Sequence, residues 1–326
     1  MTVPTVTSVT GRCRARCFKQ IEARSKRRSP QNSTDTSRQS LDYRHFDIGQ
    51  FETTADFAFN EGGGGTLVKG KKIANNIGLS EKMYSDFTFE VRNKGGHSAR
   101  PVPDNAIYHL ARALARLGDF NFPYRLSDIT KAYFEASAKV ETGDIAKDMT
   151  AVAAGDEEAM RRVAASSPNL GAMMRTTCVA TMLEGGHALN ALPQLATANV
   201  NCRILPEDSI ENVLATLRKI AGDQVQVKIR QDEGKSPPSP LRPDVMNAFN
   251  RMTDTMWPGV VTIPTMSVGA SDGRYLRESG IPTYGVSGLF ADRDDNRAHG
   301  RDERRLVTSF YEGQTFMYEI VKSLCQ

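Results

Sequence analysis

Two similar units, each an alternating strand followed by an amphipathic helix, constrain the fold of this chain more than any other feature. In residues 86–93 (DFTFEVRN) every second side chain from Phe87 to Val91 is apolar, which predicts a half-buried strand. Residues 105–120 place their apolar side chains at helical spacing, which predicts an amphipathic helix. Strand and helix signals return in the same order in residues 196–230.

Two further strands and a second helix complete this region. Strands are predicted at residues 174–185 and 196–205, then a helix with Ser209 as its N-cap, then a strand at 225–230. The order β-α-β-β-α-β is that of a split, ferredoxin-like α+β sandwich. An Ala-rich, charged insertion, residues 121–172, interrupts it and is too periodic for a linker, so two or three helices are expected there.

On both sides of the sandwich the sequence predicts parts of an α/β layer. FETTADFAFN followed by EGGGG indicates a strand that enters a glycine loop, and TLVKGKKIAN indicates a second strand. After Asp232 the segment EGKSPPSPLRP marks a boundary, beyond which helices and strands alternate. We therefore expect an α/β catalytic domain, residues 45–85 and 233–326, into which a lid domain, residues 86–232, is inserted.

The first forty residues differ in composition from the rest of the chain. They contain nine Arg or Lys residues but only Glu22 and Asp35 as acids, and residues 1–44 are expected to form a disordered basic tail. A transit peptide, a misread gene start and an ordinary tail all fit this composition. Most of the net charge of +4 lies here and the remainder is nearly neutral, which argues against a nucleic-acid partner.

Several common signals are absent from the sequence. No apolar run reaches the roughly 20 residues that a membrane span needs, and the N-terminus has no apolar signal segment, so a soluble chain without a membrane partner is expected, in a compartment left open. The five cysteines show neither disulfide nor zinc-finger spacing: Cys13 and Cys17 lie in the tail, and Cys178, Cys202 and Cys325 are scattered.

Five motifs carry polar residues typical of a catalytic site. They are ADFAFNEGGGG, GGHSARPVPDNAI, ALNALPQLATANVNCRILP, GASDGRYLRESGIPTYG and NRAHGRDERR. In this order they resemble the zinc exopeptidases and amidohydrolases that include acetylornithine deacetylase, succinyl-diaminopimelate desuccinylase, glutamate carboxypeptidase and aminoacylase. The resemblance covers about residues 50–326, and the long lid insertion is similar to the carboxypeptidase branch. It implies part of a catalytic α/β domain with an inserted dimerisation domain.

The resemblance implies two zinc ligands in this chain. Glu61 ends a predicted strand and opens a glycine loop, where the backbone turns away without a Cβ clash, and it would ligate one zinc ion. His299 lies in a polar loop before the last helix, and its neutral imidazole would ligate the other. Taken alone, each is typical of a surface loop, and only the order of the five motifs favours ligands.

Four other residues take roles from the same resemblance. His97 would reach across a dimer and stabilise the oxyanion in the partner's site, and Asn190 would hydrogen-bond the substrate or the oxyanion. Arg203 and Arg274 would bind a substrate carboxylate, which a guanidinium does bidentately. Without the motifs, His97 is equally well a turn residue, and both arginines are typical of surface ion pairs.

The remaining histidines and the first fifty residues supply no further ligands. His109 and His187 are expected to be structural, and His45 to lie on a helix surface. The family's His-x-Asp pair, its bridging Asp and its adjacent Glu-Glu, of which the first glutamate is the general base, do not occur before Glu61. The sequence therefore predicts a truncated, N-terminally incomplete catalytic domain with weak or partial zinc occupancy.

The function implied by the resemblance is zinc-dependent hydrolysis of amide or peptide bonds, in an exopeptidase, carboxypeptidase or N-acyl-amino-acid deacylase. The expected partners are a small peptide or N-acyl amino acid substrate and a second copy bound through the lid. Three hypotheses stay open: an enzyme whose remaining part lies upstream, a non-catalytic dimerising remnant that binds small carboxylates, and a tail that binds nucleic acid, which would show strong salt dependence.

Overall fold

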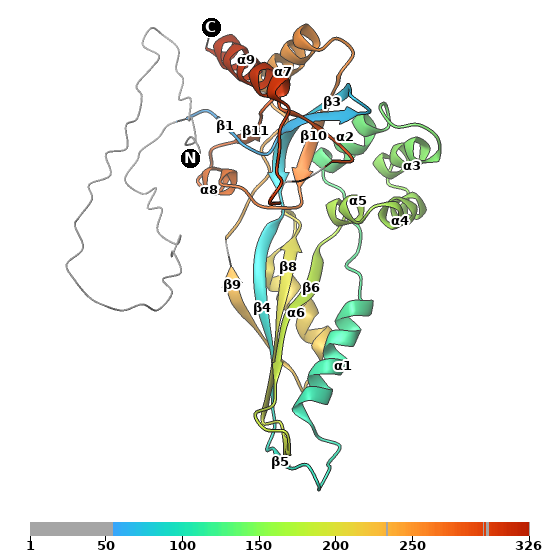
Figure 1. Ribbon diagram of the computed structural model, residues 1–326, viewed down its shortest axis with the longest axis vertical. Helices are drawn as coiled ribbons and strands as arrows, with labels where there is room; N and C mark the ends of the chain where they lie inside the picture. Colours follow the sequence, from blue (N-terminus) through green and yellow to red (C-terminus); the bar gives the residue numbers. More distant parts are fainter. Residues whose placement is uncertain (1–54, 233, 296, 298–299, 326) are drawn as a thin grey trace, which may run out of the picture.

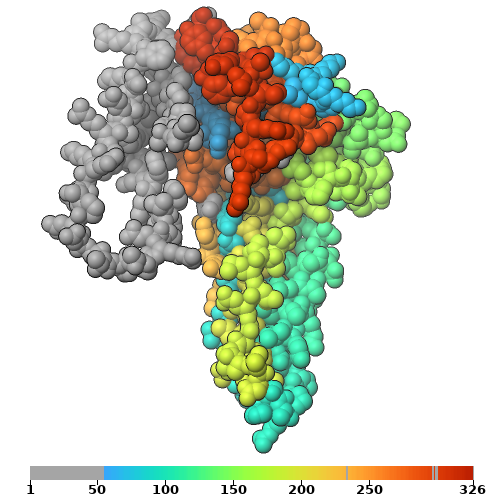
Figure 2. All heavy atoms as spheres, in the orientation of Figure 1, coloured from blue at the N-terminus to red at the C-terminus, as the bar shows by residue number. Residues whose placement is uncertain are grey.

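The computed structural model describes residues 55–232, 234–295, 297 and 300–325, and its two main β-sheets follow one another along the long axis of the molecule (Figure 1). The upper sheet has six strands and lies among most of the helices, while the four-stranded lid sheet projects from it as a narrow arm (Figure 2). The predicted basic tail, residues 1–44, lies outside the described residues.

The lid sheet has the strand order β6-β8-β4-β9, with every neighbouring pair antiparallel. The elements of this part are β4 (Met83–Arg92), α1 (Ala106–Asp119), β6 (Thr177–Gly185), β8 (Leu195–Ile204), α6 (Ile210–Ala221) and β9 (Gln226–Asp232). This is the ferredoxin-like arrangement that the sequence predicts, with the first and last strands side by side in one sheet. The predicted fold class is confirmed.

Alternation along β4 decides which face of the lid sheet is covered. Phe87, Phe89 and Val91 are buried in a core that they share with apolar side chains of α1 and α6. Each such side chain contributes about 1.5–3 kcal/mol by leaving water. Tyr84 and Asp86 point to the other face, which these two helices leave uncovered. The helix α6 begins at the predicted cap, because Ser209 Oγ accepts the N–H of Asn212.

The upper sheet is built around β3 (Lys71–Glu81), which pairs with β2 (Gly64–Val68), β10 (Val261–Ser267) and β11 (Thr283–Gly285). The prediction of a single strand in TLVKGKKIAN is wrong, because this segment is a hairpin. Its two turn residues, Lys69 (φ 50°) and Gly70 (φ 77°), both have positive φ, which reverses the chain between β2 and β3. The outer strands are β1 (Ala58–Asn60) and β12 (Phe290–Asp292).

Two long helices bury an aromatic cluster beside the upper sheet. They are α7 (Pro243–Met256) and α9 (Val307–Leu324). Phe316 of α9 stacks on Trp257 with ring centroids 5.1 Å apart and meets Phe249 of α7 edge to face at 5.3 Å. Neither α9 nor any other helix in the described part of the chain is long and apolar enough to cross a membrane.

The insertion between α1 and β6 forms four helices rather than the two or three expected. They are α2 (Asp128–Ser137), α3 (Asp144–Ala153), α4 (Glu157–Ser166) and α5 (Pro168–Met173). They share a small core of their own, to which Phe134 and Val152 contribute. Ala136 of α2 also packs on Ala74 and Ile263 of the upper sheet, so the insertion contacts that sheet through α2 (Figure 1). The domain boundaries given above remain a prediction.

A disulfide joins Cys178 of β6 to Cys202 of β8, although the cysteine spacing predicts none. The two residues are separated by 24 positions but lie directly opposite each other in the antiparallel register, with Cα atoms 4.1 Å apart. Sequence spacing does not show such a pairing, because strand register decides which residues face each other.

We expect Phe316→Ala to lower the free energy of unfolding by about 3–5 kcal/mol, because it removes a fully buried ring from the cluster with Trp257 and Phe249. The control is Tyr318→Ala, two residues further along α9 on its exposed side, which should change the free energy of unfolding by less than about 0.5 kcal/mol. Urea unfolding followed by circular dichroism measures both. Equal losses would show that the cluster does not stabilise this layer.

Candidate functional site

Glu61 lies at the end of β1, where a glycine-lined backbone crossing holds the loop. A Cβ atom on Gly63 would lie 2.2 Å from the carbonyl oxygen of Gly285, and one on Gly285 would lie 2.8 Å from the carbonyl oxygen of Glu61. Such approaches are open only to glycine. The Glu61 side chain itself is exposed, so the crossing fixes the backbone at this point and leaves the carboxylate free to face a ligand.

The loop before α8 (Gly273–Glu278) meets the same end of β1. A Cβ atom on Gly273 would lie 3.2 Å from Asn60 Nδ2, a buried donor without a hydrogen-bond partner among the described residues. Arg274, at the start of α8, lies over the ring of Tyr275 and donates from Nη2 to its hydroxyl at 2.6 Å. The structure thus brings together the segments that carry Glu61 and Arg274, which were predicted to contribute to one site.

A buried ion pair that the sequence reasoning missed supports this loop. Arg277 Nη2 lies 2.6 Å from Glu81 Oε1, and both side chains are almost completely buried. Glu81 Oε2 also accepts the backbone N–H of Ser271 at 2.8 Å and its hydroxyl at 2.7 Å. Burial lowers the pKa of Arg277, and the nearby Glu81 carboxylate opposes that shift. The available signal was a Glu-Lys pair directly after the apolar strand IGLS.

His97 and Asn190 meet at the far tip of the lid. The short strands β5 (Gly96–His97) and β7 (Ala191–Leu192) pair there, and Ser98 donates its N–H to the carbonyl oxygen of Asn190. His97 Nδ1 accepts the N–H of Ala99 at 3.1 Å, so a neutral ring carries its proton on Nε2. Because the ring is exposed, this proton is presented outward as a hydrogen-bond donor.

Arg203 lies on β8, on the uncovered face of the lid sheet. Its guanidinium stacks on the ring of Tyr84, 4.6 Å from the centroid, and the Tyr84 hydroxyl donates to Asp86 at 2.6 Å. Burial raises the pKa of Asp86, but hydrogen bonds from Tyr84, Asn201 and Asn199 outweigh burial and leave this pKa below its usual value. The charged Asp86 therefore fixes, through a hydrogen bond, the Tyr84 ring on which the Arg203 guanidinium stacks.

The predicted site residues do not all converge within one chain. Figure 1 shows β5, with His97, at the free end of the lid, and β1, which leads to Glu61, in the upper sheet at the other end of the molecule. His299 and His45 lie outside the described residues. His109 binds Asp104 at 2.9 Å and His187 is exposed.

The described residues by themselves do not fit a zinc centre. Among them, no group of three or more His, Cys, Asp or Glu side chains is placed to hold a metal ion. Glu61 is an exposed carboxylate at a rigid loop, which suits a single metal ligand. A complete centre would need donors in addition to those that the described residues supply.

Comparison with known proteins identifies the lid. Residues 79–227 match a family model described as a peptidase dimerisation domain. These residues form an M20 peptidase dimerisation domain. The matched residues contain the ferredoxin-like part, its helical insertion and the end of β3, and together with the curated relatives they confirm the predicted resemblance.

Curated relatives extend the likeness beyond the lid. The chain is 27% identical over 257 residues to a probable carboxypeptidase S-like protein of Dictyostelium discoideum, covering 78% of this chain and 49% of the relative. It is 25% identical over 258 residues to the human N-fatty-acyl-amino acid synthase/hydrolase PM20D1, covering 78% and 51%. The chain therefore spans about half the length of the curated relatives it matches.

Solved structures agree on the fold. An M20 family metallo-carboxypeptidase from Sulfolobus solfataricus superimposes with a TM-score of 0.58 at 18% identity, over 84% of this chain and 64% of that one. The dipeptidase Dug1p from Saccharomyces cerevisiae gives 0.55 at 15%, over 85% and 60%. Both support the fold, an α/β domain into which a second domain is inserted.

We expect Arg277→Met to lower the free energy of unfolding by about 3–5 kcal/mol, because it leaves Glu81 charged and buried without its partner. The double variant Glu81→Leu/Arg277→Met should lose less than the sum of the two single changes. Arg161→Met removes exposed ion pairs with Glu157 and Glu158 on α4 and serves as the control, with an expected loss of about 0–1 kcal/mol. Urea unfolding tests the series, and additive losses would contradict the coupling.

Proposed function

We propose that this chain contributes the dimerising lid and part of the catalytic layer of a metal-dependent hydrolase of amide or peptide bonds. The observation that carries the proposal is the match of residues 79–227 to a peptidase dimerisation domain. The five sequence motifs between residues 55 and 305 support it. Relatives named carboxypeptidase, aminoacylase and N-fatty-acyl-amino acid synthase/hydrolase support the reaction class. Small peptides or N-acyl amino acids are the proposed substrates.

Glu61 and His299 are the proposed zinc ligands of this chain. A bound zinc ion would polarise the amide carbonyl and make its bound water acidic. Arg203 and Arg274 would bind the carboxylate that adjoins the amide in such substrates, and their stacking on Tyr84 and Tyr275 reduces the side-chain entropy lost on binding.

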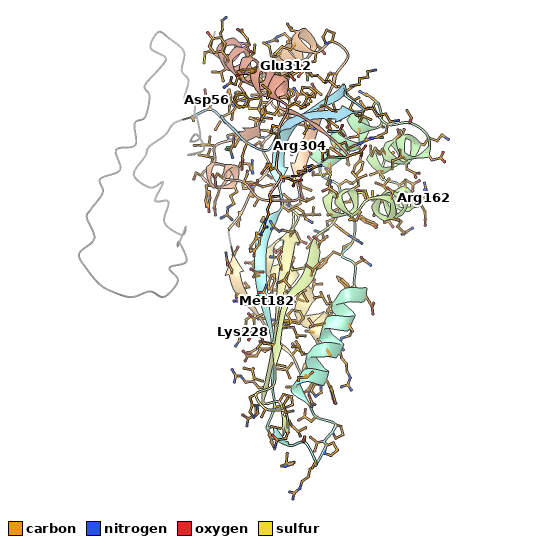
Figure 3. The ribbon with its side chains drawn as sticks, viewed as in Figure 1. Asp56, Arg162, Met182, Lys228, Arg304 and Glu312 are labelled. Atoms are coloured by element: carbon orange, nitrogen blue, oxygen red, sulfur yellow. A yellow bond between two sulfur atoms is a disulfide. The ribbon has the colours of Figure 1, made fainter. Side chains whose placement is uncertain are left out.

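The lid supplies a surface suited to a second copy of this chain. β6 forms one edge of the lid sheet, and Val179, Met182 and Leu183 are exposed along it (Figure 3 labels Met182). An exposed apolar edge strand favours pairing with another strand. In a dimer of this kind, His97 at the lid tip would serve the partner's site, which agrees with its distance from Glu61 in its own chain (Figure 1).

We expect the chain to sediment as a dimer at micromolar concentration and Leu183→Glu to sediment as a monomer, because the new charge would be buried in the interface. Ile229→Glu, on the opposite edge strand β9, is the matched control and should remain dimeric. His97→Ala should also leave the dimer intact. A monomeric parent chain, or equal disruption by both glutamate variants, would contradict the proposed interface.

We expect the 326-residue chain to bind zinc weakly and to hydrolyse N-acyl amino acids and dipeptides only at background rate. A complete structural zinc site is worth about 10–16 kcal/mol, of which one carboxylate or imidazole per metal keeps a small part, and no Glu-Glu pair precedes Glu61 to supply the general base. Calorimetric zinc titration, with Glu61→Gln as the control, and an amidase assay test this. Tight binding of two zinc ions with turnover would show that residues 1–50 supply unrecognised ligands.

The alternative function is that of a non-catalytic, dimerising protein that binds small carboxylates. It is favoured by Arg203, whose guanidinium is already held on the ring of Tyr84 in the lid. Both functions predict a dimer, so zinc affinity and turnover distinguish them. An N-acyl amino acid that binds the zinc-free chain, and that Arg203→Met no longer binds, would support the alternative.

A further inference from the structure

Each edge strand of the lid sheet carries one extra residue, and the two extra residues lie at the same level of the sheet. Thr181 of β6 has no counterpart on β8, because its two neighbours face adjacent residues of that strand. Arg230 of β9 has no counterpart on β4 for the same reason. Phe87 and Val200, at the two breaks in register, lie opposite each other, so both bulges lie in one row. Such bulges re-aim a side chain and occur beside binding sites.

Both extra residues bind the side-chain amide of Asn199, on the face of the lid sheet that α1 and α6 leave uncovered. Asn199 Nδ2 donates to Thr181 Oγ1 and to Asp86 Oδ1, at 2.9 Å in each case, which uses both of its hydrogens. Its amide oxygen is therefore the atom that accepts from Arg230 Nη1, at 3.4 Å. Because β4 lies between β8 and β9, the Arg230 side chain reaches across β4 on this uncovered face.

Asp86 organises this network from its centre and presents no free acceptor to a ligand. Its Oδ1 accepts from Asn199 and Asn201, its Oδ2 accepts from the Tyr84 hydroxyl, and the residue is buried. The charge is thus satisfied within the sheet. The guanidinium of Arg230, by contrast, belongs to an exposed residue, and among the described residues Asn199 is its one hydrogen-bond partner.

Arg203 and Arg230 lie at the two ends of one chain of contacts. Arg203 stacks on Tyr84, whose hydroxyl donates to Asp86. Asp86 is linked through Asn199 to Arg230. Neither guanidinium forms an ion pair with a carboxylate in the part of the chain that the structure describes. Two guanidinium groups and one satisfied carboxylate leave this cluster with an excess of positive charge, which favours an anionic ligand.

The spacing of the two arginines suits a small dicarboxylate. Arg203 lies opposite Tyr84, and Arg230 enters between the positions opposite Asp86 and Phe87, an offset of two to three residues along β4. That offset is roughly 8 Å at about 3.3 Å per residue. The two carboxylate carbons of a glutamate are about 5 Å apart, and a charge-assisted hydrogen bond of about 2.8 Å at each end extends this reach to about 10 Å.

We propose that Arg230 is a second carboxylate-binding residue of the lid, so that the lid selects small ligands whose two carboxylates are spaced as in glutamate. Arg203 binds one carboxylate, and Arg230, aimed by its bulge and by Asn199, binds the other. The inference rests on the carboxylate-binding role proposed above for Arg203, which both proposed functions share. It requires neither zinc nor turnover.

The test measures binding of N-acetylglutamate and N-acetylglutamine to the full chain by titration calorimetry, because these ligands differ only in the second carboxylate. At low salt we expect N-acetylglutamate to bind about three- to tenfold more tightly. Arg230→Met should reduce this preference to less than about twofold. Lys228→Met, which removes an exposed charge two residues away on β9, is the matched control and should keep the preference (Figure 3). Arg203→Met should weaken binding of both ligands.

A conservative variant separates the geometry of Arg230 from its charge. Arg230→Lys keeps the charge but loses the planar fork of donors, so we expect a preference between those of the parent chain and Arg230→Met. Raising the salt concentration should reduce the preference in the parent chain, because the residue is exposed.

Three results would overturn the inference: equal affinities in the parent chain, a preference that survives Arg230→Met, or an equal loss of preference in Lys228→Met. If N-acetylglutamine still binds in a manner that depends on Arg203, the proposed function stands and only the second clamp fails. A preference that depends on Arg230 supports the inference whether or not the chain hydrolyses amides. Failure of both ligands to bind at millimolar concentration would contradict the roles of Arg203 and Arg230 together.

Discussion

The buried charges at the β3–β4 crossover are the constraint on which the rest of the structure depends. Glu81 and Lys82 are adjacent and both are buried, but they bind different parts of the chain. Glu81 binds Arg277 and Ser271, at the loop before α8 and in α8 itself. Lys82 binds the carbonyl oxygens of Ala172 and Arg175, where the insertion ends. Since an unpaired buried charge costs several kcal/mol, each arrangement has few alternatives. The dipeptide therefore determines how the lid, the insertion and the loop before α8 meet.

The same crossover separates two kinds of functional residue. Glu61 follows β1 of the upper sheet and Arg274 lies on α8, whose first residue, Gly273, packs on Asn60 at the end of β1, while His97 and Asn190 lie at the free tip of the lid. A rigid junction is useful in such an arrangement, because a small rotation at the crossover produces a large displacement at the end of a long arm. The position of the lid tip thus depends on side chains that have no chemical role themselves.

Much of the fold could be predicted because local patterns and tertiary packing agree. The alternation of Phe87, Phe89 and Val91 and the cap at Ser209 predicted β4 and α6 correctly, since each element buries the face that its period indicates. The hairpin at Lys69–Gly70 was missed because Lys-Gly is not one of the usual two-residue turn sequences. The disulfide between Cys178 and Cys202 was missed because it depends on strand register.

The sequence by itself determined the order of the elements, the ferredoxin-like lid, the M20 resemblance and the identity of the candidate ligands, because motifs and periodicity are local properties of the chain. Only the tertiary structure decided which residues meet. It paired Glu81 with Arg277, enclosed Lys82 among carbonyl oxygens and cations, and separated His97 from Glu61. Burial and the field of neighbouring charges arise from residues far apart in sequence, and no local pattern contains them.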